Sequence, residues 1–324
     1  MHRSIPLWRQ IQRKNFTRLD QLAAFLNLTE AQKQELWGQP RFVLNLPLRL
    51  AQKIEKGTLD DPILRQFVPL QKERHSPPEF KLDPVGDLTA RKCQKLLHKY
   101  EGRALLMPTQ ACAMHCRYCF RQHFPYEKES GCEDELKLIQ EDSSLTEIIL
   151  SGGDPLSLSN EAMQSLFASL ARCKHLKRIR FHTRFPIGIP ERIDSGLLTL
   201  FKDHPQQIVF VIHSNHPREL DADVLSALQS IGKLGIPLLN QSVLLKGVND
   251  QEETQLALCQ TLVDSGILPY YLHLLDRVEG SSHFEVSEKR GLELIAYLQK
   301  RLAGYGVPRL AREEAGKPSK TLIY

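Results

Sequence analysis

Short, mostly apolar runs follow one another along the chain from Arg103 onward. Each run has the length of a strand that is buried on both faces. The segments between the runs carry apolar residues three and four positions apart, the period of an amphipathic helix, most clearly in NEAMQSLFASLARC and LDADVLSALQSIGKLG. The six predicted strands are 104–109, 147–152, 178–183, 208–214, 238–245 and 269–275.

This alternation predicts an α/β fold. Strand–helix–strand units with right-handed crossovers place their strands in parallel, and a six-fold repeat curls into a partial (β/α)6 barrel, similar to an incomplete TIM barrel. In such a barrel the chemistry lies at the carboxyl ends of the strands. Functional motifs should therefore follow the predicted strands directly.

The first part of the chain has a different pattern. Apolar residues recur at helical spacing in WRQIQRKNFTRLDQLAAFL, and Thr29 can cap a second helix in EAQKQELW. Prolines then divide the chain into short pieces, at positions 40, 47, 62, 69, 77, 78 and 84. We therefore predict an N-terminal helical collar over residues 1–98, outside the catalytic core, and a barrel core with a C-terminal tail over residues 99–324.

Composition and charge set broad limits. The 324 residues are 41% hydrophobic and 25% charged, as in an ordinary globular protein. The net charge of +5 comes from 43 basic and 38 acidic residues spread along the chain, which is too mild to indicate a nucleic-acid partner. The basic stretches 9–18 and 174–180 could contact phosphate, but solvated helix faces and loop ends explain them more simply.

The sequence shows neither an apolar run of the length of a secretory signal nor an apolar stretch that could span a bilayer. We expect a cytoplasmic protein without membrane contact. In that compartment the seven cysteines are reduced thiols or metal ligands rather than disulfides. Four of them show no ligand spacing and are interpreted as ordinary thiols: Cys93, Cys132, Cys173 and Cys259.

The first predicted strand runs directly into TQACAMHCRYCFRQ, in which Cys112, Cys116 and Cys119 have C-x3-C-x2-C spacing. Three thiolates on one loop can bind three irons of a four-iron cluster and leave the fourth iron open to a substrate or cofactor. Structural zinc is the alternative, but it usually takes two separated pairs of ligands, and the sequence has no companion C-x2-C pair. The pattern favours an iron–sulfur cluster.

This motif, placed after the first barrel strand, resembles the signature of the radical S-adenosylmethionine (SAM) enzymes. The resemblance implies a [4Fe-4S] cluster whose open iron binds SAM, and an electron donor such as flavodoxin or ferredoxin. The segment SGGDPL after the second strand resembles the glycine-rich segment that holds SAM in this family, although a glycine pair also makes an ordinary tight turn. The residues implied are Ser151, Gly152, Gly153 and Asp154.

Segments over residues 46–320 resemble one branch, the lysine 2,3-aminomutases. They are DPILRQFVP, YEGRALLMPTQACAMHCRYCFR, LSGGDPL, HSNHPREL, NQSVLLKGVND, PYYLHLLDRVEGSSHF and LAREEAGKPSKT. Within the branch the chain is most similar to the subfamily that makes (R)-β-lysine for attachment to elongation factor P. The resemblance implies an isomerase that uses pyridoxal 5′-phosphate (PLP) to move the amino group of L-α-lysine, with a functional link to the elongation factor P pathway.

Enzymes of this branch bind PLP as a Schiff base on a lysine near the C-terminus. The matching residue is Lys320 in PSKT, with Lys317 as a nearby competitor. A Schiff base needs an unprotonated amine, so we expect Lys320 in a partly desolvated pocket; without the resemblance it would be interpreted as a solvated tail residue. Tyr100 and Lys99 stand where the branch places groups near PLP, although the branch often has arginine where Lys99 stands. His213 and Gln241, at the ends of the fourth and fifth predicted strands, point toward the same end of the barrel and are candidates to line the cofactors, but such residues are more often satisfied by backbone hydrogen bonds.

The resemblance also implies the substrate contacts. Arg121 matches the arginine that pairs with the carboxylate of the substrate, for which a guanidinium is the best partner. Asp276 matches one of two aspartates that hold the ε-ammonium, and the second falls at Glu313, where the lysine enzymes have aspartate. The longer side chain leaves the preference between lysine and related amino acids open. Without the family context each acid would be an ordinary surface carboxylate.

Two other functions stay open on the sequence alone. A radical SAM enzyme that acts on RNA or protein would keep the cysteine motif and bind no PLP. A binding or scaffold protein with a structural metal would take zinc instead of iron and would not cleave SAM. The stereochemistry of the product, the oligomeric state and any direct contact with elongation factor P are also left open.

Overall fold

The computed structural model describes residues 5–126 and 131–324 and shows one sheet of ten strands that lie in chain order. The strands from β3 to β9 pair in parallel, whereas the β1–β2 hairpin and the short β10 are antiparallel to their neighbours. The strands are β1 (Arg91–Cys93), β2 (Leu96–Tyr100), β3 (Arg103–Leu106), β4 (Glu147–Leu150), β5 (Arg178–Thr183), β6 (Gln207–Ile212), β7 (Leu238–Val243), β8 (Leu268–His273), β9 (Arg309–Arg312) and β10 (Thr321–Leu322).

All six predicted strands are present, as β3 to β8, with ends that differ by a few residues. The parallel part has one further strand, β9, which the count of six missed because RLAR is short and half polar. The predicted α/β barrel is therefore confirmed and is one parallel strand longer than expected.

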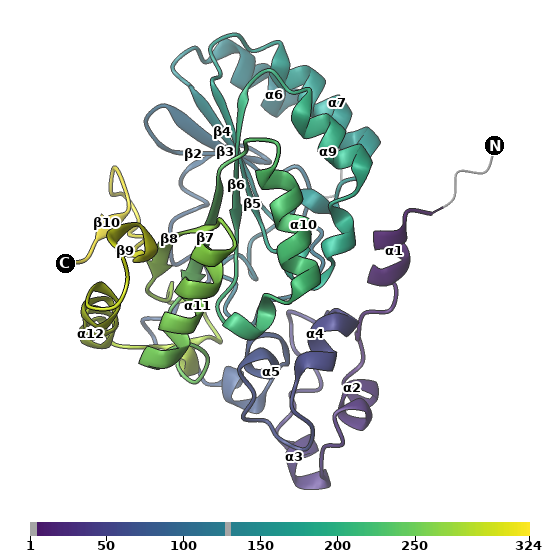
Figure 1. Cartoon of the computed structure of the whole chain (residues 1–324), viewed down its shortest axis with the longest axis vertical. Coiled ribbons are helices and arrows are strands. Elements are labelled where there is room, and N and C mark those ends of the chain that lie inside the picture. The colour runs from purple at the N-terminus through teal and green to yellow at the C-terminus, as the bar shows by residue number, and fades with distance from the viewer. Residues whose placement is uncertain (1–4, 127–130) are drawn as a thin grey trace.

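Helices cover the outer side of the curved sheet, where α7, α9, α10 and α11 follow one another in Figure 1. Several begin at a side-chain cap: Ser159 accepts from the backbone of Ala162 at the start of α7, and Asp221 accepts from Val224 at the start of α10. These helices are α6 (Glu133–Glu141), α7 (Asn160–Ala171), α8 (Phe185–Gly188), α9 (Ser195–Lys202), α10 (Ala222–Gly232), α11 (Glu252–Asp264) and α12 (Glu288–Gln299).

The two faces of the sheet differ, as β5 shows. Ile179 and Phe181 point outward into the hydrophobic core, and Phe181 packs against Phe201 of α9. Arg180 and His182 alternate with them and line a cavity on the inner side. The strands are thus apolar toward the helices and polar toward the cavity. The apolar residues of the outward side are the pattern from which the strands could be predicted.

The N-terminal segment is helical, as predicted, and lies at one end of the barrel in Figure 1. Thr29 caps α3 in a capping box with Gln32, as expected. The single helix expected before it is divided, because the backbone N–H and C=O of Phe16 both bond to Leu46. The helices are α1 (Leu7–Gln12), α2 (Leu19–Phe25), α3 (Glu30–Gln34), α4 (Leu48–Lys53) and α5 (Pro62–Phe67).

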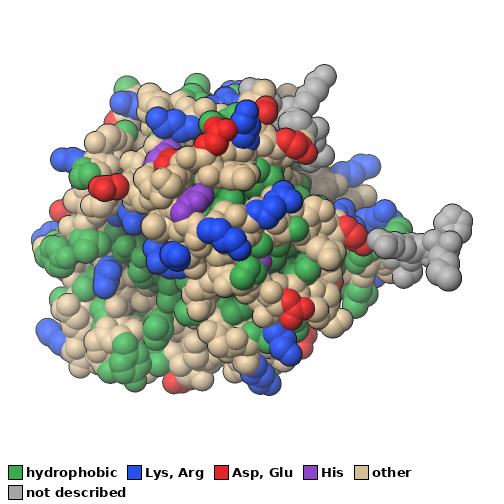
Figure 2. All heavy atoms as spheres, turned by 90° about the horizontal axis from the view of Figure 1, so that it is seen from above, with side chains coloured by type: hydrophobic (Ala, Val, Ile, Leu, Met, Phe, Trp, Pro, Cys, Tyr) green, Lys and Arg blue, Asp and Glu red, His purple; other side chains and the backbone are tan. Residues whose placement is uncertain are grey.

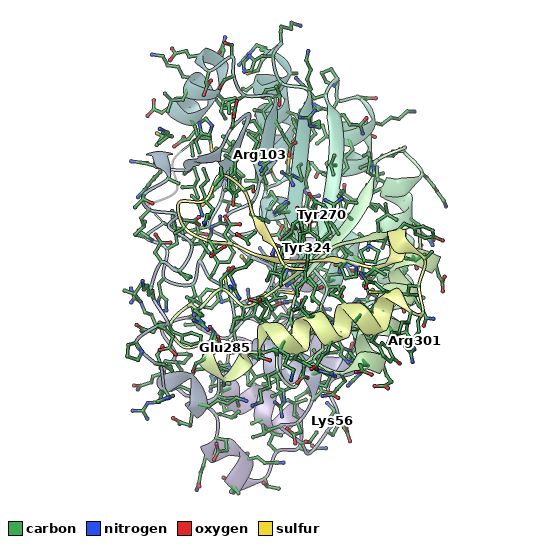
Figure 3. All side chains as sticks on the ribbon, turned by 90° about the vertical axis from the view of Figure 1, so that its left-hand side faces the viewer. Lys56, Arg103, Tyr270, Glu285, Arg301 and Tyr324 are labelled. Atoms are coloured by element: carbon green, nitrogen blue, oxygen red, sulfur yellow. The ribbon has the colours of Figure 1, made fainter. Side chains whose placement is uncertain are left out.

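The sheet begins before residue 99. The β1–β2 hairpin pairs with β3, so the limit expected between the collar and the core falls inside β2. At the other end the tail returns to the sheet, where Thr321 and Leu322 of β10 pair with β9. Figure 3 shows this tail near Tyr270 of β8, above helix α12, which lies between Glu285 and Arg301. The division of the chain into two domains stays a prediction.

Over the described residues, none of the helices has the length and apolar character needed to cross a bilayer. On the face drawn in Figure 2, lysine and arginine side chains are scattered among acidic and apolar ones. This distribution agrees with the mild net charge of +5.

Candidate active site

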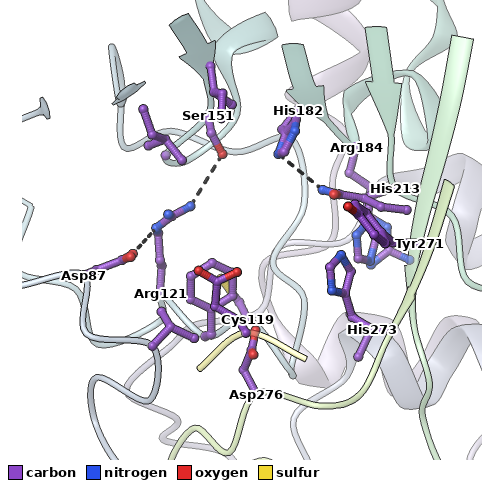
Figure 4. A pocket seen from close by; sticks show the side chains of 18 of the residues that line it. Asp87, Cys119, Arg121, Ser151, His182, Arg184, His213, Tyr271, His273 and Asp276 are labelled. Carbon is purple, nitrogen blue, oxygen red and sulfur yellow. Dashed lines mark hydrogen bonds and ion pairs between the residues drawn. The ribbon is translucent and has the colours of Figure 1, made fainter. Parts of the chain in front are cut away.

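A cavity of about 490 Å³ opens on the inner side of the sheet, at the carboxyl ends of the strands. Its volume falls within the range of small-ligand sites. The structure brings all the predicted site residues to this one cavity, although they come from both ends of the core: Tyr100, Cys112, Cys116, Cys119, Arg121, Ser151, Gly152, Gly153, Asp154, His213, Gln241, Asp276, Glu313 and Lys320. Figure 4 shows part of this lining.

The loop that carries the three cysteines is held by the N-terminal segment. Arg117, between Cys116 and Cys119, is 1% exposed and pairs with Glu73 through two nitrogens, with Nη2 2.6 Å from Oε2. Its backbone N–H donates to the carbonyl oxygen of Gln66 at 2.8 Å. Residues 66 and 73 of the N-terminal segment thus fix the cysteine loop from outside it.

The three cysteines are free and half-buried. Burial raises the pKa of Cys112 well above its usual value, and burial together with the nearby Cys116 raises the pKa of Cys119 to about 11. Thiolates crowded in such a place are costly unless positive charge neutralises them. Bound iron supplies that charge, so the donor set fits a cluster.

The glycine-rich segment after β4 packs directly against the cysteine loop. A Cβ on Gly153 would lie 2.4 Å from the carbonyl carbon and oxygen of Gln110, so only glycine allows this approach. Asp154 is buried and accepts hydrogen bonds from Leu156, Thr183, Arg184 and Phe185. Its carboxylate thus joins two loops of the barrel, and a contact of this segment with SAM stays a prediction.

Arg121 is held in place before any ligand arrives. Its Nε lies 2.6 Å from Oδ2 of Asp87, which is 1% exposed, and Lys99 approaches the other oxygen of Asp87 at 2.6 Å. Burial would raise the pKa of Asp87, but Arg121 and Lys99 together keep it below its usual value. In Figure 4 the guanidinium stands between Asp87 and Ser151, with Cys119 and Asp276 nearby.

Lys320 and Glu313 meet at the edge of the cavity. The Nζ atom of Lys320 contacts Oε2 of Glu313, and the hydroxyl of Tyr100 donates to Oε1 of the same carboxylate. Burial opposes ionisation of Glu313, yet the cationic Lys320 keeps its pKa below the usual value. Glu313 therefore already holds an alkylammonium group of the kind that a lysine substrate would bring.

Asp276 lies in the same part of the cavity, but its pKa is shifted in the opposite direction to that of Glu313. Burial raises its pKa to about 7, and the nearby Lys320 only partly opposes this. Near neutral pH the carboxyl group is therefore divided between its two protonation states, and a cation that arrives beside it would favour the ionised form.

Three histidines line the cavity, His182, His213 and His273, and burial lowers the pKa of each. The ring of His213 lies 2.8 Å from the hydroxyl of Tyr118, and Gln241 Nε2 lies 3.4 Å from Nδ1 of His182. The imidazoles are therefore neutral and suited to hydrogen bonding rather than to ion pairing.

Sequence reasoning missed several residues of the cavity. His182 and Arg184 end or follow the third predicted strand, so the expectation that chemistry follows the strands could have found them. Asp87 carries no such signal, because it lies in a loop and its partner Arg121 is 34 positions away.

Comparison with known proteins agrees with this geometry. Residues 106–258 match the model of the Radical SAM superfamily. A radical SAM methyltransferase from Sphaerobacter thermophilus has a similar fold, with a TM-score of 0.51 over 67% of this chain and 68% of that one, at 16% identity. This structural likeness concerns the fold alone.

Relatives from three organisms share the name L-lysine 2,3-aminomutase. The protein of Haemophilus influenzae is 42% identical over 92% of this chain and 89% of its own length. The protein of Escherichia coli is 41% identical over 93% of this chain and 90% of its own length. The protein of Clostridium subterminale is 30% identical over 98% of this chain and 77% of its own length. These matches favour an isomerase with a [4Fe-4S] cluster and SAM over a scaffold protein with a structural metal. The chain belongs to the lysine 2,3-aminomutase family of radical SAM enzymes.

Proposed function

We propose that this protein is a PLP-dependent lysine 2,3-aminomutase that converts L-α-lysine to (R)-β-lysine in the cytoplasm, for the modification of elongation factor P. The observation that carries the proposal is the meeting of Lys320, Glu313 and Asp276 in the same cavity as the three cysteines. A nucleophilic amine, two carboxylates and a cluster loop are the set that amino-group migration on lysine requires.

The residues of the cavity fit both ends of the substrate. Arg121, oriented by Asp87 through Nε, binds the carboxylate of lysine through its Nη atoms, of which Nη1 also lies 3.5 Å from the hydroxyl of Ser151. Asp276 and Glu313 bind the ε-ammonium, and Glu313 already contacts the ammonium of Lys320. Because Glu313 Oε2 touches Nζ, it can accept the proton that Lys320 must lose to become a nucleophile.

The cavity also offers groups for PLP. Arg103 and Arg180 line it and suit a phosphate, and Lys320 supplies the amine. When bound, PLP carries the migrating nitrogen and spreads the unpaired electron, while SAM on the reduced cluster supplies the radical. The chain's own part is to orient lysine between Arg121 and the two carboxylates and to keep Lys320 close to them.

The test replaces one lysine of the tail at a time. Lys320→Ala should abolish PLP absorbance and β-lysine formation, and the absorbance of the iron–sulfur cluster should remain. Lys317→Ala is the matched control, since it lies three positions away in the same tail and is exposed, whereas Lys320 is half-buried. Anaerobic assays with lysine, SAM, PLP and a flavodoxin or ferredoxin donor, read by chiral chromatography, give both activity and stereochemistry.

Two results would contradict the proposal. If the Lys320→Ala protein keeps PLP absorbance, the amine is another residue. If the wild-type protein forms only (S)-β-lysine or no β-lysine, the proposed product is wrong, and radical chemistry on RNA or protein becomes the function to test. Elongation factor P, supplied to the same assay with ATP and a ligase that activates the carboxylate of amino acids, shows whether the product is attached. Light scattering gives the oligomeric state.

A further inference from the structure

Arg184 stands apart from the other arginines of the cavity. It follows β5 directly, its backbone N–H donates to Oδ2 of Asp154 at 2.8 Å, and its side chain is 7% exposed. Its Nη1 lies 2.9 Å from Sγ of Cys116, one of the three cysteines of the motif. None of the roles proposed above for the substrate or for PLP uses this residue.

The guanidinium is fixed from the side opposite to the sulfur. Nη2 lies 2.6 Å from Oε1 of Gln66 and 2.9 Å from Oε2 of Glu219, and the plane lies over the ring of Phe67 at 4.5 Å. Gln66 and Glu219 are themselves joined, 3.0 Å apart, and both are 0% exposed. A side chain held at so many points keeps its remaining donors aimed at one place.

The surroundings of the three cysteines are therefore unequal. Cys116 accepts a hydrogen bond from a cationic side chain, and among the described residues neither Cys112 nor Cys119 does so through its sulfur. In addition, the Nε–H group of Arg184 is buried and has no partner among the described residues. Nη1 is the donor of this cation that reaches the cysteine, and it also contacts the hydroxyl of Tyr118.

We propose that Arg184 is a positioning residue for the iron–sulfur cluster, whose hydrogen bond to the Cys116 thiolate raises the reduction potential of the cluster. The proposal rests on the cluster that the three cysteines hold in the proposed function. A donor that withdraws electron density from a ligating sulfur stabilises the reduced cluster, which carries one more negative charge. In a buried site this effect is weakly screened.

Glu219 limits the effect without cancelling it. Its carboxylate pairs with Nη2, while Nη1 bonds to the sulfur, so the negative partner is farther from Cys116 than the donor is. Arg184 and Glu219 should therefore shift the reduction potential in opposite directions, so their substitutions should have opposite effects.

The test is a redox titration of the reconstituted protein without SAM, followed by the electron paramagnetic resonance of the reduced cluster. Arg184→Gln should lower the midpoint potential, and at a fixed poise the ratio of reduced to oxidised cluster should fall by about tenfold or more, the factor that a hydrogen bond to a charged group is worth. Glu219→Gln should raise the potential. Arg184→Lys, which keeps the charge, should lie between wild type and Arg184→Gln.

Arg192→Gln is the matched control. Arg192 is equally buried and lies on the same side of the barrel, but it donates to the carbonyl oxygens of Leu156 and Leu158 instead of a cysteine. Its loss should leave the potential unchanged even if stability falls. An assembled Arg184→Gln cluster with the wild-type potential, or an equal shift in Arg192→Gln, would overturn the proposal.

If Arg184→Gln fails to hold a cluster, Glu219→Gln decides: an unchanged or lowered potential overturns the proposal. The outcome is also separable from that of the proposed function. A wild-type protein that assembles no cluster refutes the radical mechanism itself, whereas a normal wild-type cluster that is indifferent to Arg184 and Glu219 refutes only this inference.

Discussion

The two sides of the cavity hold their charges differently. On the cysteine side, Arg117 and Arg184 pair with Glu73 and Glu219, and these four side chains are at most 7% exposed. On the lysine side, Lys320 and Glu313 are 29% and 12% exposed, and the lysine belongs to a tail attached by the two-residue strand β10.

The two sides of the cavity therefore suit different tasks: the cysteine side suits a fixed cluster, and the lysine side suits a ligand that binds and leaves. Buried pairs such as Arg117–Glu73 are costly to break, so the loop that holds the cluster has one arrangement. The pair formed by Lys320 and Glu313 is partly exposed to solvent, so either side chain can exchange its partner for a ligand. A site that must keep a cluster fixed while it takes up and releases an amino acid needs both kinds of environment.

The largest effect is expected from a substitution that removes a ligand of the cluster on the cysteine side. Cys112→Ala should abolish cluster absorbance and turnover, because two thiolates do not hold a four-iron cluster. PLP binding at Lys320 should remain, since that side is built separately. Absorption spectra and product assays give both results, with Cys132→Ser as the control outside the motif. Loss of both absorbances together would show that the two sides depend on each other.

The second test concerns stability. Glu73→Gln leaves the buried guanidinium of Arg117 without its counter-charge, so the free energy of unfolding should fall by about 3–5 kcal/mol. Urea denaturation of the apoprotein measures it. The control is Glu30→Gln in the exposed pair with Lys33, for which a change within about 1 kcal/mol is expected. Equal losses of unfolding free energy for the two substitutions would contradict the view that the cysteine side is held by buried ion pairs.

The smallest expected effect is the pH dependence of the lysine side. Burial raises the pKa of Asp276 to about 7, and only its ionised form binds an ammonium. As pH falls below about 7, kcat/KM for lysine should therefore decline, by up to about tenfold per pH unit, and above it the profile should be flat. Asp276→Asn should lower kcat/KM and remove this limb. A limb that persists in Asp276→Asn would belong to another group.

The sequence carried the barrel because the outward residues of each strand are apolar, as Ile179 and Phe181 are in β5. The sequence pattern did not predict β9, because this strand is short. It also did not predict the break before α2, because that break depends on backbone hydrogen bonds between Phe16 and the distant Leu46. Local periodicity cannot predict pairings between residues that are distant in the sequence.

The same limit applies to the site. The cysteine spacing and the tail lysine could be identified from local motifs and the family resemblance. The partners that orient them could not, since Glu73 lies 44 positions from Arg117, and Glu219 lies 35 positions from Arg184. Only the folded chain shows which buried acid belongs to which arginine.

The carboxylate of Asp154 has a consequence for protein engineering. By accepting bonds from Thr183, Arg184 and Phe185 while it closes its own turn at Leu156, it sets the spacing between the ends of β4 and β5. A longer connection at either turn would move some of these donors away from the carboxylate. A redesign of this barrel for another amino acid should leave both turns intact and insert new sequence elsewhere along the rim.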